Sequence, residues 1–379
     1  MPSTTHQRGF SLIELMVGML VSMICMLAMM AAFAVYEGKK RTTTSGNDAQ
    51  QNGSYALYTL ERQLRTAGSS IVQGLNHGLW GCPVTAYTDS KKVLPASSLP
   101  APFASSGWPL TTRLVPVLIA AGGKTGPDVI GVVSGNSALQ VFSVAVSSTP
   151  SSNGVVVSNA LGFFTGDYVA GTLSDGSCAM AHIVGNGGTA TQVPDTTLVL
   201  DTSNSPATGL QTATNLFDLG PSPTFTLYGV DPASGSLVSW DLLQRKVENQ
   251  PAAVTPIADG IVMMKALYGI QTTGSSNLTW VPPTGNWAIN KLTAGTAAAA
   301  VAMSQIKAIR VAVVAQSRLP ERAADQPASG GDGNHDLQLT LFRELPGNVQ
   351  YSMTRDPQFR YQVYETTVPV RNAMVSQFY

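Results

Sequence analysis

A single acidic residue inside a long apolar run near the N-terminus limits what this chain can form. The run follows Gly9 and extends to about Phe33, and Glu14 lies within it. A run of this length reaches the ~20 residues that an α-helix needs to cross a bilayer. A carboxylate in such a helix costs roughly 2.5–3.5 kcal/mol on insertion scales. Glu14 therefore needs a partner that offsets this cost.

The short segment that ends at Gly9 suggests a partner for Glu14. Cleavage after Gly9 would leave a free amino group on Phe10, and Glu14 of a neighbouring copy could neutralise this cation as the membrane helices stack. The segment Gly9-Phe10-Ser11-Leu12-Ile13-Glu14 closely resembles the signal of type IV prepilins. That resemblance implies that a prepilin peptidase cuts after Gly9, that Phe10 is then N-methylated, and that Glu14 is required for assembly.

Two simpler interpretations of the run are a secretory signal and a plain membrane anchor. Ala32-Phe33-Ala34 has the small-x-small form of a signal cleavage site, but the run is longer than the 7–15 residues usual for the apolar core of such a signal. Neither interpretation gives Glu14 a role.

The charges that flank the run disagree with the prepilin interpretation. Lys39, Lys40 and Arg41 follow the run, whereas only Arg8 precedes it. The positive-inside rule would therefore place the N-terminus outside the cytoplasm. A prepilin needs its leader in the cytoplasm, so we give the motif more weight than the charge count.

The composition favours an exported, β-rich head and argues against nucleic-acid binding. The 379 residues include 22 basic and 22 acidic side chains, which leaves no basic excess for a phosphate backbone. Only 12% of residues are charged, while glycine (36) and proline (23) are abundant between short β-branched runs.

Three cysteines are present, and two of them lie beyond the apolar run. Cys25 lies within the run, whereas Cys82 and Cys178 lie in the exported portion, where an oxidising compartment allows them to pair. A bridge that closes a loop of about a hundred residues would contribute up to ~4.7 kcal/mol in the chain-entropy model. The alternative is a pair of buried free thiols.

The order of predicted elements indicates an α+β protein, with a long helical spine laid against a mainly antiparallel sheet. We divide the chain into a leader (1–9), a membrane stem (10–36), the rest of the spine (37–68) and a globular head (69–379). Polar, glycine-containing residues 45–53 predict a break or kink in the helix. Leu57, Leu60, Leu64 and Ala67 form one apolar stripe that ends at the cap glycine Gly68.

Residues 69–125 read as loop-rich, and strand-like runs follow. Asp231-Pro232-Ala233-Ser234-Gly235 separates two of these runs and predicts a hairpin turn, and residues 294–304 predict a short helix. The runs span residues 129–133, 139–146, 155–157, 168–173, 179–184, 197–200, 225–230, 237–242, 261–270, 306–315, 337–342 and 361–368.

Several segments resemble PilW-type minor pilins more specifically. Gly81-Cys82 after the helix and Gly166-Asp167-Tyr168 before Cys178 fit that family, and residues 361–372 (YQVYETTVPVRN) are the most distinctive match. Further similar pieces are residues 60–68, 259–262, 266–270 and 306–317. Residues 83–127 and 271–305 depart from the family pattern.

No convincing catalytic or cofactor site emerges from the sequence. The histidines at positions 6, 77, 182 and 335 lack zinc-ligand spacing, and residues 121–125 lack the first glycine of a phosphate loop. Asp332, Asn334 and Asp336 begin like a calcium loop. The next glycine and the final glutamate of such a loop are replaced by Leu337 and Arg343, so a metal is only a weak candidate and we expect no cofactor.

The resemblance therefore predicts a non-enzymatic minor pilin that takes part in priming type IV pilus assembly at or near the fibre tip. Its implied partners are other minor pilins and the major pilin through the N-terminal helix, the prepilin peptidase and the inner membrane, with the head in the periplasm before fibre entry. A type II secretion pseudopilin and an adhesive or ligand-binding tip pilin are the alternatives.

Overall fold

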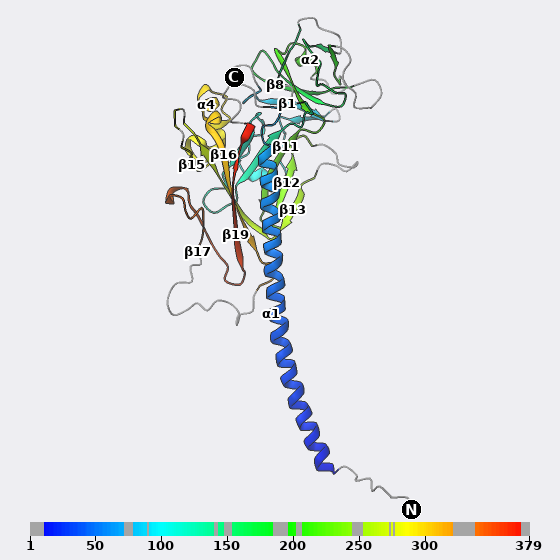
Figure 1. The fold of residues 1–379 in the computed structure, drawn as a ribbon, viewed down its shortest axis with the longest axis vertical. Coiled ribbons are helices and arrows are strands. Elements are labelled where there is room, and N and C mark those ends of the chain that lie inside the picture. Colours follow the sequence, from blue (N-terminus) through cyan, green and yellow to red (C-terminus); the bar gives the residue numbers. More distant parts are fainter. Residues whose placement is uncertain are drawn as a thin grey trace, which may run out of the picture.

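A computed structural model shows a long helical stem that carries an elongated head (Figure 1). The N-terminal half of the helix extends away from the head, and its C-terminal half lies along it. The structure describes residues 11–71, 79–88, 91–139, 143–147, 154–184, 196–201, 207–244, 253–272, 274–275, 277–320 and 338–372.

The membrane stem and the rest of the spine form one unbroken helix, α1 (Leu12–Thr66), of 55 residues. It passes without interruption through residues 45–53, so the predicted break is wrong. The C-terminal half is held by packing: Leu60, Leu64 and Ala67 are fully buried, as the apolar stripe predicts. Gly68 follows the helix with a φ of 79°, which confirms it as the cap glycine.

The surroundings of Gly53 explain why the helix tolerates a glycine at this position. A Cβ atom there would lie 2.3 Å from the ring of Tyr364 and 2.9 Å from the Cβ of Ala315. The missing side chain thus lets α1 approach β16 (Ile306–Gln316) and β19 (Tyr361–Pro369) closely. Close packing across this interface offsets the low helix propensity of glycine.

Replacement of Gly53 by alanine should therefore destabilise the head, because roughly 1–3 kcal/mol of overpacking outweighs the advantage of about 1 kcal/mol that alanine has in helix propensity. Gly46 is the matched control, because a Cβ there would meet no atom within 4 Å. Thermal unfolding of the full chain in detergent, followed by near-UV circular dichroism, should show a lower Tm for Gly53→Ala and an equal or higher one for Gly46→Ala. Equal stabilisation by both substitutions would contradict the close approach.

The described residues of the head form three larger sheets and two small ones. The five-stranded sheet has the order β13-β12-β11-β4-β3, and the four-stranded sheet has the order β15-β14-β16-β19. Besides β16 and β19, these two sheets contain β3 (Val117–Ala120), β4 (Val129–Ser134), β11 (Thr224–Asp231), β12 (Ser236–Asp241), β13 (Thr255–Asp259), β14 (Ile261–Ile270) and β15 (Thr279–Val281).

The six-stranded sheet, β2-β1-β8-β7-β10-β5, lies at the end of the head farthest from the stem (Figure 1). Its strands are β1 (Val84–Thr88), β2 (Lys91–Leu94), β5 (Val144–Ala145), β7 (Tyr168–Thr172), β8 (Cys178–His182) and β10 (Asn215–Gly220). The two-stranded sheets are β6 (Gly154–Val156) with β9 (Thr197–Val199), and β17 (Gln338–Leu341) with β18 (Tyr351–Thr354). The short helices are α2 (Ala207–Leu210), α3 (Ile289–Leu292) and α4 (Ala297–Gln305).

Part of the far end has a hydrophobic core of its own. Residues of β5 to β10 contribute to this cluster, among them Phe163, Leu198 and Leu216, and it is separate from the main core beneath α1. We call the segment from β5 to β10, residues 144–220, the distal lobe.

A buried ion pair joins the two sheets nearest the helix. The Nζ atom of Lys265 on β14 lies 2.8 Å from Oδ1 of Asp128, which precedes β4, and both side chains are at most 1% exposed. Asp128 also accepts hydrogen bonds from the backbone N–H groups of Gly122 and Ala266 at 2.9 and 3.0 Å. The ammonium further donates to a backbone carbonyl and lies over the Tyr351 ring of β18. The pair therefore links three parts of the head.

Most predicted strands are present, and the β11–β12 hairpin turns at the predicted residues 231–235. The loop-rich interpretation of residues 69–125 is wrong in part, because β1, β2 and β3 lie there. These strands are short and lie in a proline-rich stretch, so their pairing depends on distant partners. The glycine-rich residues 321–334 lie within a stretch outside the described residues.

Candidate functional site

The described helix begins at a capping box that involves Glu14. The backbone N–H of Ser11 donates to Oε2 of Glu14 at 3.0 Å, and the Ser11 Oγ accepts from the N–H of Ile13 at 3.3 Å. An acid in the first turn also complements the positive end of the helix dipole. Gly9 and Phe10 lie outside the described residues, so the structure places only the acid of the predicted cleavage and assembly site.

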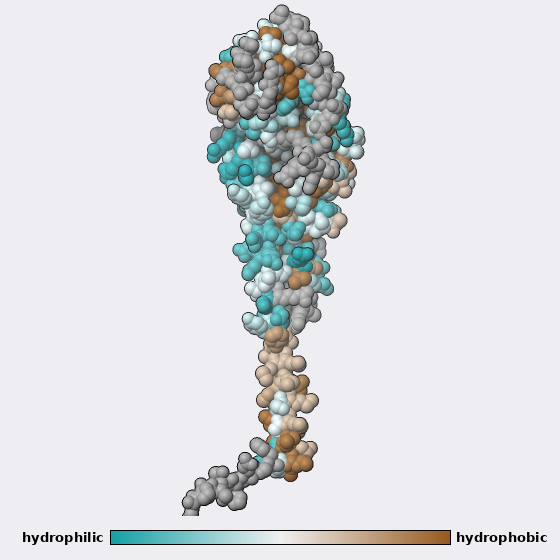
Figure 2. Space-filling model, turned by 90° about the vertical axis from the view of Figure 1, so that its right-hand side faces the viewer, coloured by the Kyte–Doolittle hydropathy of each residue, from teal (hydrophilic) through white to brown (hydrophobic). Residues whose placement is uncertain are grey.

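From Leu12 to Tyr36 the side chains of the helix are exposed. Its large apolar side chains in this stretch are 54–77% exposed, and the most apolar window has a mean hydropathy of 2.4. Figure 2 shows this stretch as an apolar column below a mostly polar head. At about 1.5 Å per residue the stretch exceeds the ~30 Å hydrocarbon core of a bilayer. By length and composition this helix is suited to cross a membrane.

The packed half of α1 is pinned near both of its ends by the C-terminal part of the chain. The N–H of Leu319 donates to Oγ of Ser45 at 3.2 Å, and the amide of Asn372 donates to the carbonyl of Ala67 at 2.9 Å. The helix therefore changes its surroundings between Tyr36 and Ser45. Before Tyr36 the helix exposes apolar side chains, and after Ser45 it is packed in the head.

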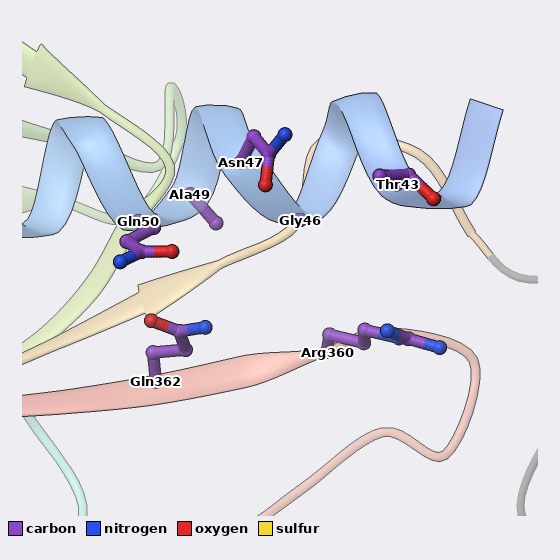
Figure 3. Close-up of a pocket in the computed structure, with 7 residues that line it drawn as sticks. All are labelled: Thr43, Gly46, Asn47, Ala49, Gln50, Arg360 and Gln362. Atoms are coloured by element: carbon purple, nitrogen blue, oxygen red, sulfur yellow. The ribbon is translucent and has the colours of Figure 1, made fainter. Parts of the chain in front are cut away.

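A polar cleft lies where the packed half begins (Figure 3). It encloses about 170 Å³ between α1 and β19, and Gln50 and Gln362 face each other across it. Its lining is completed by Thr43, Gly46, Asn47, Ala49 and Arg360. The lining contains no acid, histidine or cysteine, so it supplies neither a metal ligand set nor an acid–base pair.

Cys82 and Cys178 form a disulfide, which confirms the predicted pairing, with their Cα atoms 5.7 Å apart. Strands β1 and β8 run parallel here, and Val84 is the register partner of Cys178. The bridge thus joins the segment after α1 to the sheet of the distal end. Cys25 is free and exposed on the stem.

Loss of this bridge should lower the free energy of unfolding by about 2–5 kcal/mol, because it removes the constraint on a long loop of the unfolded chain. Urea denaturation of the chain with Cys82→Ala and Cys178→Ala together would measure the change. Cys25→Ala, which alters the stem alone, should leave the urea midpoint of the head unchanged. A double variant with the wild-type midpoint would show that the bridge contributes no stability.

Sequence reasoning missed a buried carboxyl group in the distal lobe. Asp218 on β10 is fully buried, and it accepts hydrogen bonds from Ser137 Oγ and, at 2.9 Å, from the N–H of Gly220. Burial raises the pKa of Asp218 to about 6, and the charge of nearby Asp167 adds to the shift, while the two hydrogen bonds oppose it. The sequence predicted no strand over residues 215–220, and a single aspartate between apolar residues gives no signal of burial.

The raised pKa of Asp218 predicts a pH dependence of stability. The folded state holds the proton more tightly than the unfolded chain, so this group's stabilising contribution is full below about pH 4 and is lost as pH rises through about 6. A shift of about two units corresponds to ~3 kcal/mol. Asp218→Asn should therefore gain stability relative to wild type as pH rises from 4 to 7.

The measurement is urea denaturation of wild type and Asp218→Asn at several pH values. Asp175→Asn is the control, because hydrogen bonds from Ser177 lower the pKa of this exposed carboxylate. Its stability relative to wild type should therefore fall, and not rise, as pH increases. A constant difference between Asp218→Asn and wild type across this range would contradict the assignment.

The weak calcium candidates Asp332, Asn334 and Asp336 lie outside the described residues. Within the described ranges, no group of three or more histidine, cysteine, aspartate or glutamate side chains is arranged to hold a metal.

Comparisons with known proteins match two separate parts of the chain. The family model described as Type IV Pilus-assembly protein W matches residues 228–372, and that of the prokaryotic N-terminal methylation motif matches residues 4–30. These two segments together match a PilW-like prepilin. The first match contains β14, β16 and β19, which contact α1. The second contains Gly9, Phe10 and Glu14.

No curated protein matches the chain. Among solved structures, a type IV-like pilin from Thermus thermophilus is similar, with 12% identity over 55% of this chain and 84% of that chain, at a TM-score of 0.20. A TM-score this low carries no argument about the present fold. The α+β assignment rests on the observed helix and antiparallel sheets.

Proposed function

We propose that this chain is a non-enzymatic minor pilin that takes part in initiating type IV pilus assembly and occupies the fibre tip. The observation that carries the proposal is the division of α1 into an exposed apolar half, with an acid in its first turn, and a half packed in the head. After leader removal the apolar half would hold the subunit in the inner membrane, with the head in the periplasm.

The mechanism of assembly would be helix packing combined with one charge pair. Lipid supplies no hydrophobic driving force between membrane helices, so their fit and polar contacts decide how they associate. In the structure Glu14 caps its own helix through Ser11. In an assembly the carboxylate would instead meet the new amino group of Phe10 on an adjoining subunit, and each charge would compensate the other in lipid.

The cap and the charge can be separated by substitution. Glu14→Gln keeps an oxygen that can accept from the Ser11 N–H but removes the charge, whereas Ser11→Ala removes the serine cap and keeps the charge. We expect both variants to be cut after Gly9, and Glu14→Gln to be depleted about tenfold or more in sheared fibres, as loss of ~1.4 kcal/mol or more implies. Ser11→Ala should enter fibres normally.

Immunoblots of sheared fibres, normalised to cellular levels, give the measurement, and mass analysis of the mature N-terminus checks processing. Normal amounts of Glu14→Gln in fibres would show that the charge pair is not required. Detection of an N-terminus other than Phe10 would overturn the prepilin role as a whole.

An adhesive or ligand-binding tip pilin is a second candidate, favoured by one observation. The distal lobe has its own core, lies at the end of the head farthest from the stem, and falls between the two matched segments. Deletion of the gene distinguishes the roles. Loss of fibres supports initiation of assembly, whereas intact fibres that no longer attach to surfaces support adhesion.

A further inference from the structure

Strand β19 forms one edge of the four-stranded sheet, and its backbone pairing shows which groups face outward. It pairs with β16 in antiparallel register over nine residues, without a shift. The N–H of Val370 donates to the carbonyl of Lys307, and the N–H of Ser317 donates to the carbonyl of Arg360. Because such bonds alternate along an antiparallel pair, the even-numbered residues of β19 bond to β16.

The odd-numbered residues of β19 therefore direct their backbone N–H and carbonyl groups away from the sheet. These residues are Tyr361, Val363, Glu365 and Thr367, with the carbonyl of Pro369 beyond them. Within the described part of the chain, no hydrogen bond reaches these four N–H groups. The result is a regular row of donors and acceptors without a bulge.

This edge differs from the other sheet edges of the described residues. Natural sheets protect their edges with short strands, lysines, prolines and bulges. Strand β2 is four residues long, carries Lys91 and Lys92 and has a register shift, and β13 is five residues long with Pro256 and a register shift. Strands β3, β5 and β15 have four, two and three residues. Strand β19 has nine residues, no basic side chain and no bulge, and its one proline, Pro369, is its last residue.

Both faces of β19 pack against other elements, which leave most of its residues half-buried. On one face the ring of Tyr364 packs against Gly53 of α1, and on the other Val363 packs in the core beneath β17 and β18. The single charge of the strand, Glu365, is held by Arg310 at 2.9 Å and by the N–H of Phe342 at 2.8 Å. A long, regular edge with unpaired backbone groups is a template for strand addition.

We propose that the outer edge of β19 receives an extended segment of a different polypeptide of the fibre assembly, which adds a strand to this sheet. The proposal rests on the proposed role in a fibre. The polar cleft between α1 and β19 lies beside the start of the edge and offers hydrogen-bonding side chains, Gln50 and Gln362 among them, to polar residues of the incoming strand.

A second copy of the chain is a poor occupant of this edge. Two copies joined antiparallel through β19 would be related by a twofold axis perpendicular to the strands. Since α1 runs alongside β19 in Figure 1, their stems would then point in opposite directions. Two such stems cannot lie in one membrane with both heads on the same side, so a different chain fits the edge.

Proline at an outward-facing position tests the proposal with little effect on the fold. Thr367→Pro removes an N–H that the sheet does not use, and proline is tolerated on an edge strand where its N–H would face solvent. Thr367→Ala is the matched control, because it shortens the same side chain and keeps the N–H. Both variants should have Tm values close to each other in detergent, which shows that each has folded.

Two readouts are required. A photo-crosslinking amino acid at position 362 of full-length chains in cells should give an adduct with an extended segment of another fibre protein, and Thr367→Pro should reduce this adduct at least about fivefold relative to Thr367→Ala, a loss of ~1 kcal/mol. Amide exchange should show fast exchange at residues 363, 365 and 367 in the purified chain and protection in the assembled fibre.

Equal adduct yields in the proline and alanine variants would overturn the proposal, as would protection of the odd-numbered amides in the purified monomer. Protection that appears on self-association of the purified chain would identify a second copy as the occupant and overturn it as well. Absence of the wild-type chain from fibres would refute the proposed function. The proposal about β19 is tested separately, by the difference in crosslinked adduct between Thr367→Pro and Thr367→Ala in cells.

Discussion

The structure depends on one helix that must satisfy two different environments. An α-helix completes its own backbone hydrogen bonds, so the same element can lie in lipid over one half and against protein over the other. In α1 the side chains alone make the distinction: apolar all around in the first half, and a single apolar stripe with a closely packed glycine in the second. The head is built to receive the second half without interrupting the helix.

The second half of α1 packs mainly against strands from the C-terminal part of the chain. The sheet that α1 contacts most extensively ends with β19, so the surface that holds the helix includes the last strand of the chain. The Lys265–Asp128 pair adds a further constraint, because two charges with almost no exposure are tolerated only when each is fully hydrogen-bonded. Together these features fix the helix, two sheets and the β17–β18 hairpin relative to one another.

The sequence was informative where a local pattern carries the physical cause. The membrane-length run, the stripe from Leu57 to Ala67, Gly68 and the hairpin turn are local patterns, and the disulfide followed from the compartment and cysteine count. Gly53 was misleading, because a helix-weakening glycine and a close-packing glycine look the same until the facing ring of Tyr364 is known. The burial of Asp218 and the open edge of β19 depend on which strands become neighbours, and no single stretch of sequence states this.

The disulfide and the seating of α1 together define how the head would carry load. Tension along the stem reaches the head through contacts of α1 with β16 and β19, strands that run alongside it, so their ladder is stressed in shear with all its hydrogen bonds sharing the force. The Cys82–Cys178 bridge then ties the chain that leaves the helix to the far sheet by a covalent link. Force on the subunit would thus pass from the stem to the far end of the head through a sheared ladder and a covalent bond. The hydrogen bonds between β16 and β19 would not have to break one after another.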